Sequence, residues 1–204
     1  MWFEARSNFS AVLPSDCLGL LNVQSNGNAS NRLLAVVLDT MKDAEFRDMN
    51  HNHVGVHSVQ SYYEDGTSES CNMTMIRCEA LWIWVDYNTE ATQINVTMAS
   101  QNMAKPARPL VSARTNLSTV LTDSASVRFS AATGGMLKSR HYVLGWSFGM
   151  DCPAPAIDIS KLPKLPRVGA STGQGSCRSS RHCSLPPCRR HGHVPTGEEA
   201  LEVR

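Results

Sequence analysis

Short apolar runs separated by polar turns are the main pattern along the first 168 residues of this 204-residue chain. The clearest run, Leu33–Leu38, is aliphatic and β-branched, and it ends abruptly at Asp39. Such a run, closed by polar residues, predicts a buried strand. A second run, Val54–Val56, follows after an acidic loop that carries histidines, and it predicts the neighbouring strand.

Alternation of apolar and polar residues predicts several more strands. Residues 80–87 and 92–98 both alternate, and Asn88 lies in a hairpin-like connection between them. Three shorter strands are expected at 117–121, 126–131 and 141–148. No stretch between residues 33 and 150 keeps a helical period over several turns, so we expect no long helix there. Many short strands with turns between them favour an all-β sandwich.

The composition of the chain changes at Gly169. From there to Arg204 the chain is rich in Ser, Gly, Pro, Arg and His and has almost no apolar periodicity. A segment of this composition cannot bury enough apolar surface to offset its loss of conformational entropy. We therefore expect one domain over residues 1–168 and a disordered tail over residues 169–204. The cysteines and histidines of this tail lack the spacing of a zinc site, so no metal is expected there.

Charge and hydropathy exclude some classes of function. The net charge is +1, which gives no electrostatic reason for binding nucleic acid or an anionic membrane. No apolar run approaches the about 20 residues of a membrane span, and the first ten residues do not resemble a signal peptide. Asn-x-Ser/Thr sequons nevertheless favour a secreted origin. They begin at Asn8, Asn28, Asn72, Asn95 and Asn116.

The seven cysteines are an odd number, so at least one thiol has no partner within the chain. Cys71 and Cys78 are close enough in sequence to bridge a hairpin loop. Unpaired thiols are the favoured alternative for the cysteines of the first 168 residues, which are Cys17, Cys71, Cys78 and Cys152.

The loop between the first two predicted strands carries candidate metal ligands. Asp39, Asp43, Asp48 and His53 lie within a short span of sequence. Carboxylates that converge in this way repel one another unless a cation lies between them. Carboxylate oxygens suit Ca²⁺, and an imidazole beside them suits a transition ion such as Mn²⁺.

Five further motifs accompany this loop along the chain. They are LGLLN at 18–22, ALWIWVDYN at 80–88, ARPLVSA at 107–113, SAATG at 130–134 and HYVLGWSF at 141–148. Together with the loop, they resemble the legume-type (L-type) lectin domain, in particular the lectin ectodomain of plant lectin receptor-like kinases. Any one motif is weak, but their joint presence in the family order is specific.

The resemblance implies a jelly-roll sandwich of the legume lectin, concanavalin-like type over residues 1–168, incomplete at its N-terminus. It also implies a carbohydrate or glycoconjugate as partner, and a location outside the cell or at its surface. No Gly-rich phosphate loop, kinase catalytic loop or catalytic triad is recognisable, so we expect no enzyme activity. Exposed sheet edges of an incomplete sandwich would favour a homodimer.

The resemblance also implies a ligand set for two metal ions. Asp39 and Asp48 match the two family aspartates that bridge Ca²⁺ and Mn²⁺. The backbone carbonyl of Met41 matches a Ca²⁺ ligand, and His53 matches the histidine on Mn²⁺. Asp43 occupies a position where the family has an asparagine that binds both Ca²⁺ and the sugar.

Two positions depart from the family pattern in the metal loop. Val37 stands where the family has a glutamate that binds Mn²⁺, so full Mn²⁺ occupancy is doubtful. Asp43 can still bind Ca²⁺, but a carboxylate has no N–H to donate to a sugar hydroxyl. The alternative to a two-metal site is a solvated acidic loop that keeps the family spacing without holding both ions.

The sugar site departs further from the family pattern. Asp43, Met41, Gly134, Gly135 and Met136 are the residues that the resemblance places at the sugar. A Gly-rich turn between two strands explains the SAATG run equally well. After Val56 the chain is a few residues shorter than the family pattern. Tryptophans such as Trp82, Trp84 and Trp146 favour core positions over a sugar-stacking platform. The alternative function is therefore a degenerate lectin-like structural or interaction fragment that binds no sugar.

Overall fold

The computed structural model describes residues 2–4, 32–42, 48–58, 66–75, 79–121, 123, 125–132, 140–150 and 152–164. Some positions for which the sequence makes predictions lie outside these residues. They are Asp43, Gly134, Gly135, Met136, Cys17, Cys78 and the tail from residue 169. For residues 2–4 the backbone alone is described.

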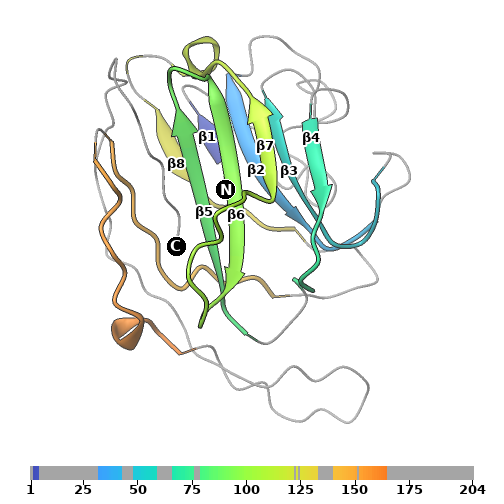
Figure 1. Cartoon of the computed structure of the whole chain (residues 1–204), viewed down its shortest axis with the longest axis vertical. Helices are drawn as coiled ribbons and strands as arrows, with labels where there is room; N and C mark the ends of the chain where they lie inside the picture. Colours follow the sequence, from blue (N-terminus) through green and yellow to red (C-terminus); the bar gives the residue numbers. More distant parts are fainter. Residues whose placement is uncertain are drawn as a thin grey trace.

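Two antiparallel sheets form the fold, with the smaller sheet lying in front of the larger one in Figure 1. The five-stranded sheet has the order β4-β3-β2-β1-β8. Its strands are β1 (Trp2–Glu4), β2 (Leu33–Asp39), β3 (His53–Ser58), β4 (Gly66–Ser70) and β8 (Ser126–Arg128). The three-stranded sheet consists of β5 (Leu81–Asn88), β6 (Gln93–Ser100) and β7 (Val111–Arg114). The prediction of an all-β fold is confirmed, and the described residues contain no long helix.

The core lies between the two sheets and takes alternate residues from β2, β3, β5, β6 and β7. The fully buried side chains that form it are Leu34, Val54, Val56, Val85, Ile94, Val96, Val111 and Val120. Burying one side chain of this size contributes about 1.5–3 kcal/mol. The alternation in residues 80–87 and 92–98 therefore predicted the inward faces of β5 and β6 correctly.

β2 is buried on both of its faces. Leu34 and Val36 join the core between the sheets, while Ala35 and Val37 point to the opposite side of the same sheet and are buried as well. This explains why the sequence of β2 is continuously apolar instead of alternating. The run ends at Asp39, which brings the last residue of the strand to the predicted metal loop.

The β5–β6 hairpin turns at Asn88, as predicted. The side chain of Asn88 accepts a hydrogen bond from the backbone N–H of Ala91 at 2.7 Å, and Thr92 adopts a left-handed backbone conformation with φ of 48°. On the outer face of this hairpin, Trp84 is 4% exposed. The expectation that Trp84 is a core or sheet-face residue, and not an exposed sugar platform, is confirmed.

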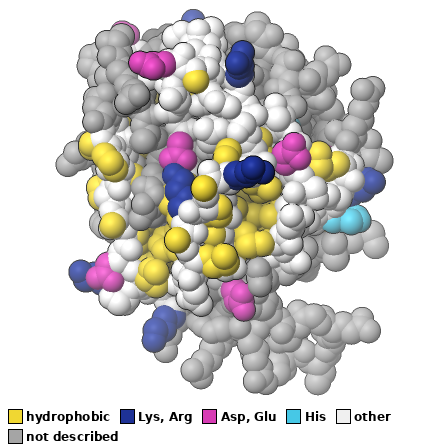
Figure 2. All heavy atoms as spheres, viewed as in Figure 1, with side chains coloured by type: hydrophobic (Ala, Val, Ile, Leu, Met, Phe, Trp, Pro, Cys, Tyr) yellow, Lys and Arg dark blue, Asp and Glu magenta, His cyan; other side chains and the backbone are white. Residues whose placement is uncertain are grey.

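Apolar side chains gather on the front face of the molecule, over the three-stranded sheet, with charged side chains around them (Figure 2). Lys105 forms an ion pair with Asp86 at 2.8 Å and lies 5.9 Å from the centre of the Trp84 ring. The tryptophan rings of Trp82 and Trp84 are 6.1 Å apart, and Trp82 donates its Nε1–H to the carbonyl of Gln101. These contacts fix the outer surface of β5.

The predicted short strands at 117–121 and 126–131 differ from the structure. Residues 117–121 contain a 3₁₀ helix, η2 (Leu117–Thr119), because the Asn116 side chain caps the backbone N–H of Ser118. Only Ser126–Arg128 of the predicted 126–131 strand pair in a sheet. A second 3₁₀ helix, η3, spans Ile159–Lys161.

Residues 141–148 were predicted to form a strand, and this prediction is wrong. The segment has no regular secondary structure, and residues 143–148 are all half-buried. Trp146 and Phe148 lie against the core, and the ring centres of Trp146 and Phe129 are 5.8 Å apart in an edge-on arrangement. Packing of these side chains against the core therefore accounts for the apolar residues of the segment.

Cys71 and Cys152 are free thiols, which confirms the unpaired alternative for these two described cysteines. No helix within the described part of the chain is long and apolar enough to cross a membrane.

Candidate metal centre

Three of the predicted metal ligands meet where β2 ends and β3 begins. Asp39 is the last residue of β2, and its ladder partner is His53, the first residue of β3. Asp48 approaches from the loop between them. One potential ligand atom from each of the three side chains lies within 4.8 Å of the others. Two strands and their connecting loop thus place two carboxylates and one imidazole in a single small volume.

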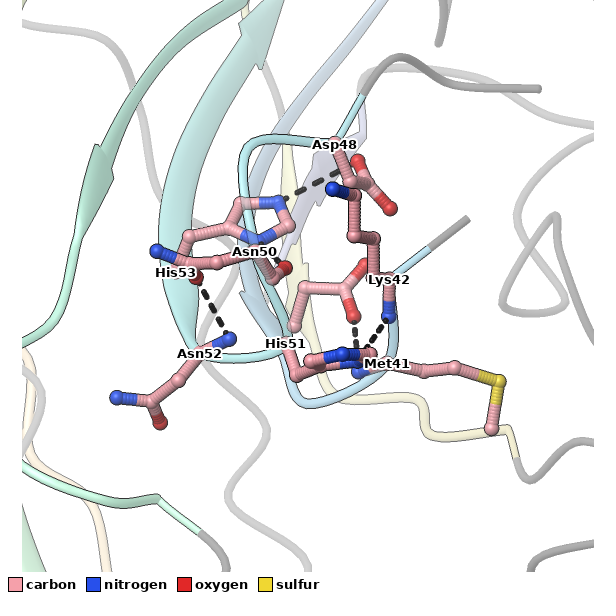
Figure 3. A network of polar contacts seen from close by, with 8 residues as sticks. Met41, Lys42, Asp48, Asn50, His51, Asn52 and His53 are labelled. Atoms are coloured by element: carbon pink, nitrogen blue, oxygen red, sulfur yellow. Dashed lines mark hydrogen bonds and ion pairs between the residues drawn. The ribbon is translucent and has the colours of Figure 1, made fainter. Parts of the chain in front are cut away.

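The orientation of His53 is fixed by its neighbours. The ring is 5% exposed, and its Nδ1 lies 3.0 Å from the backbone carbonyl oxygen of Asn50. Because a carbonyl oxygen only accepts hydrogen bonds, Nδ1 carries the proton. The other nitrogen, Nε2, then faces the Asp48 carboxylate at 3.5 Å (Figure 3). With the proton on Nδ1, Nε2 carries a lone pair that faces this carboxylate. A metal ion between the two atoms would bind both of them.

Asp39 also has a local partner that orients it. Its Oδ1 accepts a hydrogen bond from the backbone N–H of Met41 at 2.7 Å. This contact turns the chain after β2 and orients the Asp39 carboxylate. Through this hydrogen bond the backbone of Met41 lies next to the Asp39 carboxylate.

Asn52 ties the metal loop to the segment that follows β4. Its side-chain amide donates to the carbonyls of Cys71 and Met73 at 2.6 and 2.8 Å, and its side-chain oxygen accepts from the N–H of Met75 at 2.8 Å. Its backbone carbonyl accepts from the N–H of Cys71 at 2.8 Å. Both the amide and the oxygen of the Asn52 side chain are therefore hydrogen-bonded, and they connect two loops that are distant in sequence.

Asn50 and His51 support the same loop. The Asn50 side chain accepts from the N–H of Asn52 and donates to the hydroxyl of Ser70 at 2.7 Å. Nδ1 of His51 accepts from the N–H of Lys42 at 3.2 Å, which joins the two sides of the loop (Figure 3). These hydrogen bonds hold the described ends of the loop, residues 40–42 and 48–52, so Asp39, Asp48 and His53 are preorganised.

The sequence reasoning missed Asn50 and Asn52. The signal that could have identified them is the Asn-His-Asn-His run at residues 50–53, since asparagine side chains commonly hydrogen-bond to nearby backbone in turns. The sequence could not show that Asn52 reaches Cys71, Met73 and Met75, because those contacts depend on the tertiary fold.

The described donors, two carboxylates and one imidazole, could hold a metal ion. Asp39 and Asp48 supply hard carboxylate oxygens, which Ca²⁺ prefers. His53 supplies a nitrogen, which suits a transition ion. Val37 is buried beside these residues and has no atom that can bind a metal. Asp43, the further predicted ligand, lies outside the described residues.

Comparison with known proteins adds an independent line of information. A family model described as the legume lectin domain matches residues 3–164. Similar proteins include the L-type lectin-domain containing receptor kinases SIT2 and SIT1 of Oryza sativa subsp. japonica, which are 46% and 47% identical over 168 residues. The L-type lectin-domain containing receptor kinase IV.1 of Arabidopsis thaliana is 48% identical over 162 residues.

These matches cover most of the chain but a small part of each relative. They include 78% of the chain for the two rice proteins and 76% for the Arabidopsis protein. The chain spans about a quarter of the length of these relatives, since the matches cover 25%, 25% and 24% of them. The matched part is the lectin domain, which is a non-catalytic fold, and not the kinase.

Proposed function

Because this chain belongs to the legume lectin domain family, we propose that it is a carbohydrate-binding module without catalytic activity. The observation that carries the proposal is the convergence of Asp39, Asp48 and His53, whose ligand atoms lie within 4.8 Å of one another. An acidic cluster of this kind, partly buried and held by Asn50 and Asn52, has a physical reason to exist if cations neutralise it.

The proposed mechanism depends on a rigid loop. Ca²⁺, and a transition ion that is Mn²⁺ in the family, would supply the positive charge that holds the carboxylates together. Asp39 and Asp48 would bind both ions, the Met41 carbonyl and Asp43 would bind Ca²⁺, and His53 would bind the transition ion. Asn50 and Asn52 keep the loop in one conformation, so its polar groups present a fixed pattern to sugar hydroxyls.

We place the sugar at the edge of this loop. Asp43 and Met41 would contact it from the metal side, and Gly134, Gly135 and Met136 from a neighbouring turn. Asp43 accepts hydrogen bonds but donates none, so sugar hydroxyls must act as the donors there. An unmade polar contact of this kind costs about 1–3 kcal/mol, so we expect weak binding of simple sugars.

The proposed setting is extracellular or at the cell surface, as the lectin part of a plant receptor-like protein. The sequons at Asn72 and Asn116 support this setting, because both side chains lie on the surface. A homodimer formed through sheet edges is a further expectation, and sedimentation equilibrium at several concentrations would test it.

A glycan array with and without EDTA tests the proposed function. Binding to one class of glycan that EDTA abolishes and added Ca²⁺ restores is the expected result. The matched control is an Asp48→Asn chain, which should behave like the EDTA-treated protein. If no glycan binds under any metal condition, the carbohydrate-binding proposal is wrong.

A second function, a lectin-like interaction domain that binds no sugar, is favoured by one specific observation. Val37 is 6% exposed and fills with methyl groups the position where a carboxylate would complete the transition-metal site. Under this alternative the chain would still bind Ca²⁺ and resist unfolding, but it would bind no glycan on the array.

A further inference from the structure

The fold treats the sequons of the described part of the chain differently from one another. These sequons begin at Asn72, Asn95 and Asn116. In an N-glycosylation sequon the asparagine receives the sugar, and the Ser or Thr two positions later is required as well. An enzyme that modifies the folded chain must therefore reach both side chains of a sequon. Their exposure, and the pairing of the backbone between them, decide whether it can.

The sequons at Asn72 and Asn116 lie outside the sheets and are open. Asn72 and Thr74 are exposed in the segment after β4, and Asn116 and Ser118 are exposed in the segment after β7. The Oδ1 atom of Asn116 accepts hydrogen bonds from the N–H and the hydroxyl of Ser118 at 3.0 and 2.7 Å. Its amide nitrogen, the atom that bonds to a sugar, has no hydrogen-bond partner within the described residues.

The sequon at Asn95 lies in β6, the central strand of the smaller sheet (Figure 1). Asn95 pairs with Asp86 of β5 on one side and with Ser112 of β7 on the other. Its side chain is half-buried, and the Ser112 hydroxyl donates to its Oδ1 at 2.7 Å. Thr97, which supplies the hydroxyl of this sequon, is 3% exposed. An enzyme therefore cannot reach this hydroxyl while the sheet is intact.

Access to Asn95 requires the smaller sheet to open. Ile94 and Val96, which flank Asn95, belong to the core between the sheets. The carbonyl of Val96 also accepts from the N–H of Leu110 at 2.7 Å. Core strands open only at a free-energy cost close to that of global unfolding. The rate of modification then falls with the population of the open chain, as it does for proteolysis.

We propose that the folded chain accepts an N-linked oligosaccharide at Asn72 and Asn116, and that the fold closes the sequon at Asn95. The donor is a polyprenyl pyrophosphate oligosaccharide. In the transfer, Nδ2 of the asparagine gives a proton to a base of the transferase and bonds to C1 of the sugar. The bond between C1 and the pyrophosphate oxygen breaks, and the lipid pyrophosphate leaves. The inference goes beyond sugar binding and rests on the proposed extracellular setting, since such transferases modify secreted chains.

The test compares the folded chain with unstructured reference peptides. The full chain is made in bacteria that lack N-glycosylation and is incubated with a purified single-subunit oligosaccharyltransferase and its lipid-linked donor. Synthetic peptides of residues 69–77, 92–100 and 113–121 serve as references. Peptide mapping by mass spectrometry gives the initial rate at each asparagine. The ratio of the rate in the folded chain to the rate in the peptide removes differences in the intrinsic quality of the sequons.

We expect this ratio to agree within about 10-fold between Asn72 and Asn116 and to be at least about 100-fold lower at Asn95. Ser118→Ala should abolish modification at Asn116, whereas Ser118→Thr should keep it, and residue 118 is exposed in both variants. The inference is overturned if Asn95 has the same ratio as Asn116. It is also overturned if either exposed sequon shows the suppression expected for Asn95.

A core variant tests whether folding itself closes Asn95. Val85 is 1% exposed in β5, and Val85→Ala leaves the sequons intact. Removal of buried methyl groups destabilises the fold, so a larger fraction of the chains is open. The rate at Asn95 should rise by roughly 10-fold or more, while the rate at Asn116 stays the same. An unchanged rate at Asn95 in a measurably destabilised Val85→Ala chain would contradict the inference. Because these rates are measured with purified components, a glycan array without any binding would leave the inference standing.

Discussion

At the scale of single residues, Asn52 is the side chain that links the metal loop to the rest of the fold. It contacts the backbone of Cys71, Met73 and Met75 through three side-chain hydrogen bonds. Each of these backbone groups is far from residue 52 in sequence. The position of the proposed metal ligand His53, which follows Asn52 directly, depends on this clamp.

We expect Asn52→Ala to lower the free energy of unfolding by about 2–3 kcal/mol, because two carbonyls and one N–H lose their partner. Urea unfolding followed by circular dichroism measures the change. Asn88→Ala is the matched control: it removes one exposed hydrogen bond to Ala91 and should cost about 1 kcal/mol or less. Equal losses in the two variants would show that Asn52 is not a clamp.

The two described free thiols should differ in reactivity. Burial raises the pKa of the Cys71 thiol, while the Cys152 side chain is exposed. Because the thiolate is the reactive form, iodoacetamide at neutral pH should label Cys152 well before Cys71. Peptide mapping by mass spectrometry over a time course gives both rates in one experiment. In urea the difference should disappear, and faster labelling of Cys71 in the folded chain would contradict its placement.

At the scale of elements, the segment from residue 140 to 164 packs on the sandwich without joining a sheet in the described part of the chain. Two glycines show how closely the segment packs against itself. A Cβ on Gly149 would meet backbone atoms, including the N of Ala154 at 2.7 Å, whereas a Cβ on Gly145 would first meet the end of the Leu162 side chain. Backbone cannot move aside as a side chain can.

Gly149→Ala should therefore destabilise the fold by about 1–3 kcal/mol, the usual cost of overpacking. Gly145→Ala has the same chemistry in the same segment and should cost clearly less, because Leu162 can change its rotamer. Thermal unfolding of the two variants side by side measures the difference. A larger loss in Gly145→Ala would mean that this segment packs differently from the structure.

At the scale of the whole molecule, the metal loop joins β2 and β3, which are adjacent strands of the larger sheet. An ion bound between Asp39 and Asp48 would therefore stabilise the folded chain as a whole and not the loop alone. A ligand that binds only the native state stabilises it by mass action.

We expect Ca²⁺ at 100 times its dissociation constant to add about 2.7 kcal/mol to the free energy of unfolding. Differential scanning fluorimetry with increasing Ca²⁺ should show a rising melting temperature that EDTA reverses. Asp48→Asn should abolish the rise while leaving the metal-free chain folded. A melting temperature that does not respond to millimolar Ca²⁺ would argue against a functional metal centre.

The sequence by itself determined the fold class, the strands β2, β3, β5 and β6, and the meeting of Asp39, Asp48 and His53. The physical reason is that these features are local: strand periodicity and ligand spacing follow directly from neighbouring residues. The same local reasoning failed at residues 141–148, where Trp146 and Phe148 pack on the core but the described chain has no regular secondary structure.

Tertiary structure alone decided the features that depend on contacts between distant segments. It set the register of β2 and β3, which pairs Val37 with Gly55 and Asp39 with His53. It joined Asn52 to Cys71 and Met73, and it set the His57 ring over Gly55. Strand register decides which side chains become neighbours, and register depends on pairing with a partner strand, which no single stretch of sequence contains.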